Sequence, residues 1–433
     1  MALTLPFDPA ESVSATRLAW AIERYAAGEL TAQHIEATHE FDPGYDVVRH
    51  LRRFRLFRRP IDEVLSYQPD SIRPHAVVRS GNDTAVVSVL LGDGPEHRIV
   101  AMWLTKQPAA GVTTRVATEA DARALRDLER RCAVETGGVS VFYDRGDDYF
   151  AQQRLMPRHW SSVAEYEDRI VGVSSDAIHR IRVAGTEYRT TYRFHLRVDP
   201  EFRGLGILPA LNVSQRLHIH ADRPLPLPQV YVAAENAQAL AVRGVQSEGD
   251  WPTNIERIVL SCSELDGPPF GRRATVADAT RMAELLAACH GLEELALDFD
   301  ASWVAERLGR SPRDYSWENI TLSKRAVLGV WDSGLRIVRT DASGTTTNRT
   351  ATVLDWGFEQ GADAEMEGLL RGVCATLAAR GVDDLVIFSS PPSRGRALLV
   401  RLARTVERFR VGTGGIQPLR DSTNGIYVDP IYF

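Results

Sequence analysis

The chain has 433 residues, of which 44% are hydrophobic and 25% charged, and a formal net charge of −6 at pH 7. This length fits about three domains of ordinary size, and the composition is typical of a soluble globular protein. The acidic balance gives no basic field for nucleic acid, no apolar run is long enough to span a bilayer, and four isolated cysteines predict neither a zinc site nor a disulfide framework.

Residues 1–108 predict a small α+β domain. The helical pattern "SATRLAWAIERYAAGEL" comes first, and four segments rich in β-formers follow at 61–70, 72–81, 84–93 and 97–105. This layout and the last strand, "HRIVAMWLT", resemble the cone-shaped nuclear-transport-factor-2-like domains. Such a domain could bind the substrate, bind a second ligand or mediate dimerisation, so a homo-oligomer is one of the open alternatives.

Residues 113–267 predict a second domain, and residues 272–433 predict a third that starts in the same way. In 113–267 a strand and a helix are followed by strands near 160–169 and 170–184, a central strand at 188–198, a helix to His220 and a closing strand, "NIERIVLSCSEL". The openings "TRVATEADARAL" and "RRATVADATRMAEL" can be laid over each other, which predicts a duplicated domain.

The segment "VDPEFRGLGILPAL" predicts a glycine-containing turn between the central strand and the next helix. The first N–H groups of a helix have no partner within it, and the helix dipole adds partial positive charge. Glycines allow a close approach of the backbone, and Arg203 can add a charge-assisted bond. The turn therefore suits an anion such as a phosphate.

The string L-x-V-x-P-x-x-R-G-x-G, carried here by Leu196, Val198, Pro200, Arg203, Gly204 and Gly206, resembles the GNAT superfamily of acyl-CoA-dependent N-acyltransferases. The resemblance implies two GNAT-like domains with mixed central sheets, and so a fold class of mixed α+β and α/β. It implies that the turn Arg203, Gly204, Leu205, Gly206, Ile207 and Leu208 holds the coenzyme A pyrophosphate. The main chain of Leu196, Arg197 and Val198 would pair with the pantetheine, and Asn236 would contact the cofactor arm.

The reaction that this resemblance implies needs a base, because a neutral amine must attack the thioester. Many family members place a Glu on the central strand, and this strand has none, so Tyr192 and His195 are the candidates there, with Glu235 beside Asn236. The family's Tyr about seven residues after the Asn is replaced by Arg243. The proton donor stays open: positioning and an oxyanion contact could suffice, or another Tyr could serve.

The third segment departs from the family pattern at its own strand-to-helix turn, Phe358 to Asp363. It has no Arg-x-x-Gly-x-Gly string, and Glu359 and Asp363 would repel a pyrophosphate, so we expect this copy to have lost coenzyme A binding. An intact copy followed by a degenerate one resembles the Eis-like tandem acetyltransferases, in which the final carboxylate can reach the active site. Phe433 is therefore a further catalytic candidate; alternatively, the tail only completes the last sheet.

Together, these features predict an enzyme that transfers an acetyl or other short acyl group from acetyl-CoA, or another acyl-CoA, to a primary amine of a small molecule. Two alternatives stay open: a non-catalytic coenzyme A-binding protein, and an acetyltransferase of protein lysines or N-termini. No metal, nucleic acid or membrane partner is expected. We expect a cytoplasmic location, because the N-terminus lacks a basic region followed by a hydrophobic stretch.

Overall fold

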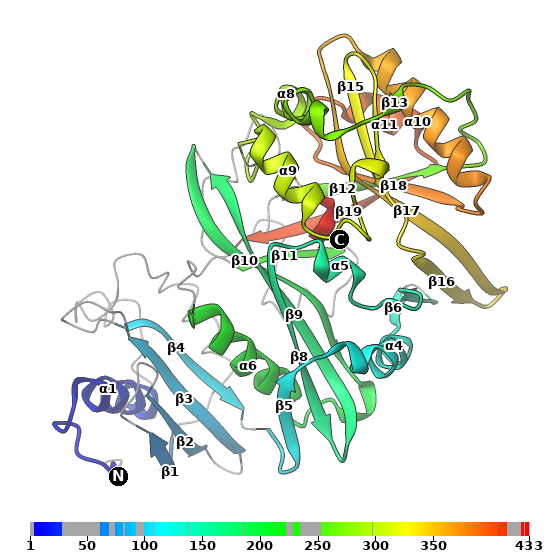
Figure 1. Ribbon diagram of the computed structural model, residues 1–433. Helices are drawn as coiled ribbons and strands as arrows, with labels where there is room; N and C mark the ends of the chain where they lie inside the picture. The colour runs from blue at the N-terminus through cyan, green and yellow to red at the C-terminus, as the bar shows by residue number, and fades with distance from the viewer. Residues whose placement is uncertain are drawn as a thin grey trace. The chain divides into compact units, whose positions relative to one another are not determined.

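The computed structural model in Figure 1 describes residues 4–27, 61–68, 74–80, 83–91, 99–106, 108–136, 138–183, 185–221, 228–233, 253–296, 298–413, 426–427 and 429–432. The chain divides into two compact units. The first comprises Met1–Val112 and Gly204–Ala210, and the second Thr113–Arg203 and Leu211–Phe433. The boundaries predicted from the sequence, 1–108, 113–267 and 272–433, stay predictions.

The first unit is a helix on an antiparallel sheet. Helix α1 (Val13–Ala27) precedes β1 (Glu63–Gln68), β2 (His75–Ser80), β3 (Asp83–Leu91) and β4 (Ile99–Lys106), which pair in chain order. One face of α1, with Leu18 and Ile22, packs on alternate residues of the strands, such as Val78 and Val87. This pattern, with a period of two along each strand, confirms the predicted α+β layout. The cone-shaped, nuclear-transport-factor-2-like form stays a prediction.

The strands of the second unit form one sheet (Figure 1). They are β5 (Val112–Val116), β6 (Val134–Thr136), β7 (Val139–Asp144), β8 (Arg158–Tyr166), β9 (Arg169–Val183), β10 (Thr186–Val198), β11 (Pro228–Ala233), β12 (Thr253–Ser261), β13 (Arg272–Arg273), β14 (Ile320–Leu322), β15 (Ala326–Trp331), β16 (Arg336–Asp341), β17 (Gly344–Phe358), β18 (Asp384–Ser389) and β19 (Thr405–Thr413). The main order is β13-β14-β15-β17-β18-β12-β19-β11-β10-β9-β8-β5, and β16, β7 and β6 continue from β17.

The pairing order is the same on both sides of β12 and β19. On one side β10 runs parallel to β11, and on the other β17 runs parallel to β18, while the other pairs with a recorded register are antiparallel. The closing strands are exchanged: β12, which follows β11 in the chain, pairs with β18, and β19, which follows β18, pairs with β11. The two strands also pair with each other. The sheet is therefore mixed, as the sequence predicts.

The two openings that overlay in sequence also have the same local structure. Arg115 donates to both carboxylate oxygens of Asp121 at 2.8 Å, and Arg272 donates to both oxygens of Asp278 at 2.8 and 2.5 Å. Each aspartate also accepts a hydrogen bond from the backbone N–H three residues earlier, at 2.7 and 2.8 Å, in a capping box that starts the following helix.

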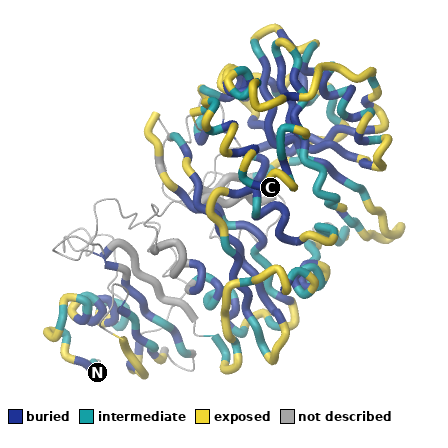
Figure 2. Tube along the Cα trace, in the orientation of Figure 1, coloured by how far each residue is buried: buried dark blue, intermediate teal, exposed yellow. Residues whose placement is uncertain are grey.

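Helices cover the sheet of the second unit, and Figure 2 shows its central strands as buried. They are α4 (Ala122–Arg131), α5 (Ala151–Arg154), α6 (Ile207–Ala221), α8 (Ala279–His290), α9 (Ala301–Gly309), α10 (Asp363–Ala378) and α11 (Arg396–Leu402). The second unit has an N-terminal half, which ends with β12, and a C-terminal half, which begins with β13. One core cluster joins them: Met156 and Phe194 pack with Met282, Leu308 and Ile431. Within the described ranges, no helix has the length and apolar character needed to cross a bilayer.

Candidate active site

A β-bulge interrupts the central strand β10 where the sequence predicts the pantetheine contacts. The register with β9 shifts between Phe194 and Arg197, so that His195 and Leu196 together lie opposite Ser174. His195 is 6% exposed and has φ 50°, a conformation that costs a non-glycine residue roughly 1 kcal/mol or more. Bulges re-aim side chains and often lie next to active sites, so this strained histidine is a functional candidate.

The bulge lies on a part of β10 that has separated from its parallel neighbour. β10 pairs with β11 only at Thr191 and Tyr192, whereas β11 continues beside β19 as far as Ala233. Within the described strands, the β10 edge from Arg193 to Val198 therefore has no ladder partner on the β11 side. An open edge of this kind can accept an extended ligand by main-chain hydrogen bonds, as an added strand does.

The predicted glycine turn follows directly after β10 in the chain. Gly204 and Gly206 have φ values of 90° and 76°, which only glycine adopts readily, and α6 begins at Ile207. Before the turn, Asp199 caps a short 3-10 helix and accepts hydrogen bonds from Arg131 at 2.6 Å and Arg169 at 2.8 Å. The glycines therefore have the conformation that the predicted strand-to-helix turn needs.

The His195 imidazole is held by a network through Gln152 of α5. The Gln152 amide nitrogen donates to the Ile431 carbonyl at 2.8 Å, and its amide oxygen accepts from Arg145 at 2.9 Å. That same oxygen lies 3.1 Å from His195 Nε2, so Nε2 must be the donor. The neutral ring then carries its lone pair on Nδ1, which is buried and has no hydrogen-bond partner among the described residues.

Burial, and then the positive charges of Arg145 and Arg197, hold the pKa of His195 well below its usual value. The ring is therefore neutral at pH 7 and able to accept a proton. The ring of Tyr149 lies 5.5 Å from it, centroid to centroid, and the buried Tyr149 hydroxyl also has no hydrogen-bond partner within the described part of the chain. Burial raises the pKa of Tyr149 above its usual value, so this hydroxyl stays protonated.

The other predicted residues have different surroundings. Tyr192 is buried, with its ring stacked on Phe194 at 5.4 Å in the apolar core. Glu235, Asn236 and Phe433 lie outside the described residues.

Gln152, Tyr149 and Arg145 are not among the site residues predicted from the sequence. The signal that was available is the polar pair "QQ" inside the apolar stretch "YFAQQRLM". Polar residues in such a stretch must find buried partners, as Gln152 does.

The corresponding strands of the C-terminal half also separate from each other. β17 pairs with β18 only from Thr350 to Thr352 and then separates from it. Trp356 lies beyond that point and packs on the start of α11, where a Cβ on Gly395 would come within 2.5 Å of the indole. At the turn, Glu359 accepts hydrogen bonds from Arg281 at 2.6 Å and Arg325 at 2.9 Å. Both arginines near this turn thus already have a carboxylate partner within the chain.

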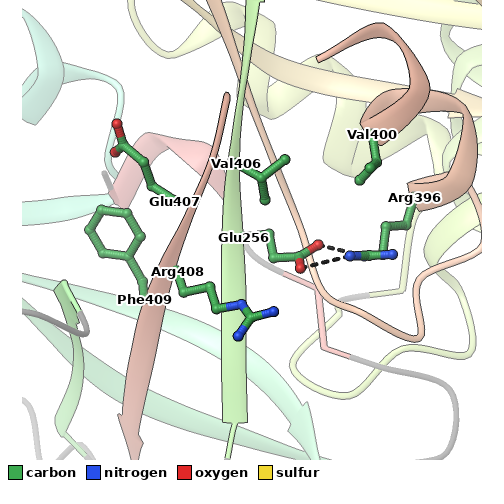
Figure 3. Close-up of a pocket in the computed structure, with 7 residues that line it drawn as sticks. All are labelled: Glu256, Arg396, Val400, Val406, Glu407, Arg408 and Phe409. Carbon is green, nitrogen blue, oxygen red and sulfur yellow. Dashed lines mark hydrogen bonds and ion pairs between the residues drawn. The ribbon is translucent and has the colours of Figure 1, made fainter. Parts of the chain in front are cut away.

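A hollow of about 510 Å³ lies over β12, β19 and α11 (Figure 3). Its buried carboxylate, Glu256, forms a bidentate ion pair with Arg396 at 2.5 and 2.8 Å. None of the predicted site residues lines it. Among the described residues, no three His, Cys, Asp or Glu side chains are grouped so that they could hold a metal ion.

No protein-family model matches the chain, and no curated protein matches it. Solved structures do. Saccharomyces cerevisiae N-myristoyltransferase with bound myristoyl-CoA is 10% identical, with a TM-score of 0.53 over 78% of this chain and 87% of that one. A structure of the yeast enzyme with myristoyl-CoA and inhibitors is 11% identical, with a TM-score of 0.50 over 78% and 89%. A GCN5-related N-acetyltransferase from Kribbella flavida is 18% identical, with a TM-score of 0.39 over 70% and 72%. At such identities the likeness shows the fold alone: the chain shares the fold of N-myristoyltransferase.

Proposed function

We propose that the protein transfers an acyl group, most simply acetyl, from acyl-CoA to a primary amine of a small molecule. The observation that carries the proposal is the strained His195 at the bulge of β10, whose Nδ1 has no partner among the described residues and lies beside a strand edge that no described strand covers. Buried polar atoms are normally hydrogen-bonded, so an unpartnered one beside such an edge indicates a place for a ligand.

In the proposed binding mode, the pantetheine arm adds to the open edge at Leu196, Arg197 and Val198. The pyrophosphate lies at the turn from Arg203 to Leu208, whose N–H groups and arginine favour an anion. The main chain at the bulge would then meet the thioester carbonyl, where an N–H group can stabilise the oxyanion of the tetrahedral intermediate. Asn236 would contact the same arm.

In the proposed reaction, the amine nitrogen attacks the thioester carbon as its proton passes to a base. The C–S bond then breaks, leaving the amide and the coenzyme A thiolate, which takes up a proton. We assign the base to His195 because its Nδ1 has no hydrogen-bond partner among the described residues. We assign the proton donor for the thiolate to the neighbouring buried Tyr149 hydroxyl, which has none among them either. Tyr192, Glu235 and the carboxylate of Phe433 remain alternative bases. Ile431, two residues before the chain's last residue, accepts from Gln152.

We also propose that the second unit is a tandem of two GNAT-like domains, the second without coenzyme A. The repeated pairing order and the repeated arginine–aspartate cap support a duplication. Trp356 packed against Gly395, and Glu359 held by two arginines, support the loss of cofactor binding in the second copy.

The experiment is free-thiol release from acetyl-CoA with a panel of small amines, beside a panel of lysine-containing and N-terminal peptides. Turnover with small amines supports the proposal, and turnover with peptides alone would favour a protein acetyltransferase. Coenzyme A binding without thiol release would favour the non-catalytic alternative. To separate the bases, we compare His195→Asn, Tyr192→Phe, Glu235→Gln and deletion of Phe433, because loss of a general base lowers kcat by about 10²–10⁴-fold. An unchanged kcat in His195→Asn would exclude His195.

A further inference from the structure

A buried ion cluster lies in the C-terminal half, around Arg307 of α9. Its side chain is 4% exposed and forms an ion pair with Asp355 of β17 at 2.9 Å. It also donates to both carboxylate oxygens of Asp429 in the C-terminal tail, at 2.7 and 2.9 Å. One guanidinium thus holds two carboxylates, and the arrangement with Asp429 is the planar bidentate one that fixes geometry best.

The two carboxylates of this cluster differ in how else they are held. Asp355 is fully buried, lies within a strand next to its bulge and accepts a hydrogen bond from Tyr315 at 2.8 Å. Asp429 lies in the short tail segment and is 16% exposed. Arg307 therefore has partners fixed by the sheet, namely Asp355 and the Leu354 carbonyl at 3.3 Å, and it holds the tail through Asp429.

The tail runs from this cluster to the His195 network. Upstream it is tied by Ile426, whose N–H donates to Ser390 at 2.9 Å, and by Tyr427, whose N–H donates to the Glu294 carbonyl at 2.8 Å. Ile431 follows Asp429 by two residues, and its carbonyl accepts from Gln152. A two-residue spacing leaves little slack, so a displacement of Asp429 must move the Ile431 carbonyl.

We propose that Arg307 is a positioning residue for acyl transfer, acting through Asp429 and the C-terminal tail on the Gln152–His195 pair. This rests on the proposed function. In this arrangement the second half, although without coenzyme A of its own, supplies the fixed point that orients the histidine of the first half. A misplacement of about 1 Å at a reacting group can lower the rate about 10²-fold, so the bidentate clamp has a catalytic consequence.

The test compares two isosteric variants of the full chain. Asp429→Asn weakens the clamp. As a control, Glu256→Gln weakens another bidentate pair, between Glu256 and Arg396 (Figure 3), in which neither side chain has a hydrogen bond to the described tail residues. For Asp429→Asn we expect kcat to fall by about tenfold or more, while KM for acyl-CoA stays within about twofold. Glu256→Gln should leave kcat unchanged, even where it lowers the melting temperature as much as Asp429→Asn does, or more. In Arg307→Lys the ammonium group keeps the positive charge but cannot form the bidentate pair. We therefore expect a kcat between that of Asp429→Asn and that of the unmodified protein.

A second measurement reads the tail directly. Carboxypeptidase digestion followed by intact-mass analysis should remove residues through Ile431 faster from Asp429→Asn than from the unmodified protein or Glu256→Gln. Equal digestion of all three overturns the clamp. Faster digestion with an unchanged kcat overturns the positioning role. If no amine is acylated at all, the proposed function fails and the positioning role with it, whereas the digestion still decides whether Arg307 holds the tail.

Discussion

Replacing Gln152 by Glu should move the pH dependence of turnover, because it places a carboxylate against the donor nitrogen of His195. The two groups are 3.1 Å apart. At an effective dielectric constant of about 20, unit charges at this separation attract by roughly 5 kcal/mol, which is an upper bound of about 4 pKa units. Arg145 donates to the same oxygen and takes part of that attraction. We therefore expect the His195 pKa to rise by about one to three units.

The sign of the effect follows from the direction of the native shift. His195 has a lowered pKa, so its neutral form contributes stability above the unfolded value, and that stability is lost as pH falls. In Gln152→Glu the charged form of the ring is favoured instead. The free energy of unfolding at low pH therefore increases, and the ring becomes protonated at a higher pH than in the unmodified protein. The acid limb of kcat/KM should move up by about one to three pH units, with activity retained at alkaline pH.

The assay is thiol release from about pH 9 down to the lowest pH at which urea unfolding shows that both proteins are still folded. The positive charges that help to lower the pKa of His195, those of Arg145 and Arg197, remain in place. Gln153→Glu is the matched control, because Gln153 is the neighbouring buried glutamine of α5 and accepts from Ser161 instead, at 2.9 Å. A folded Gln152→Glu protein whose acid limb coincides with that of the unmodified protein would refute His195 as the base.

Gly206→Glu should abolish coenzyme A binding in calorimetry, since it places a charge at the turn and strains a φ of 76°; retained affinity would move the pyrophosphate elsewhere. Calorimetry of the unmodified chain should give one coenzyme A per chain, because the arginines at the second turn are already paired with Glu359; a stoichiometry of two would contradict this. Gly329→Ala should lower the free energy of unfolding in urea by about 1–3 kcal/mol, because its Cβ would collide with the Tyr315 hydroxyl. Asp121→Asn should destabilise the protein near pH 7 but not near pH 2, since Arg115 lowers the pKa of Asp121 to about 2; a difference that persists in acid would argue against the ion pair.

The sequence predicts the positions of individual strands, turns and helices well, but it does not predict which strands pair with each other. The central strand, the glycine turn and the helix after it appear as expected, because the alternation of β-formers and the positive-φ glycines are local signals. The strand at Thr253–Ser261 was also expected, but its partners β18 and β19 are set by long-range pairing that periodicity does not encode. His195 was one candidate among several, and only the bulge and the Gln152 contact distinguish it.

The exchange of β12 and β19 has a consequence during protein synthesis. β11 leaves the ribosome long before β19, so one edge of β11 stays without its final neighbour until nearly the whole chain has emerged. Exposed strand edges template association with other chains, and the risk is greatest in slowly completed intermediates. A nascent chain that stops before Thr405 would keep the glycine turn and His195 but leave β11 uncovered on one side. Such a product should aggregate rather than persist as a smaller folded protein.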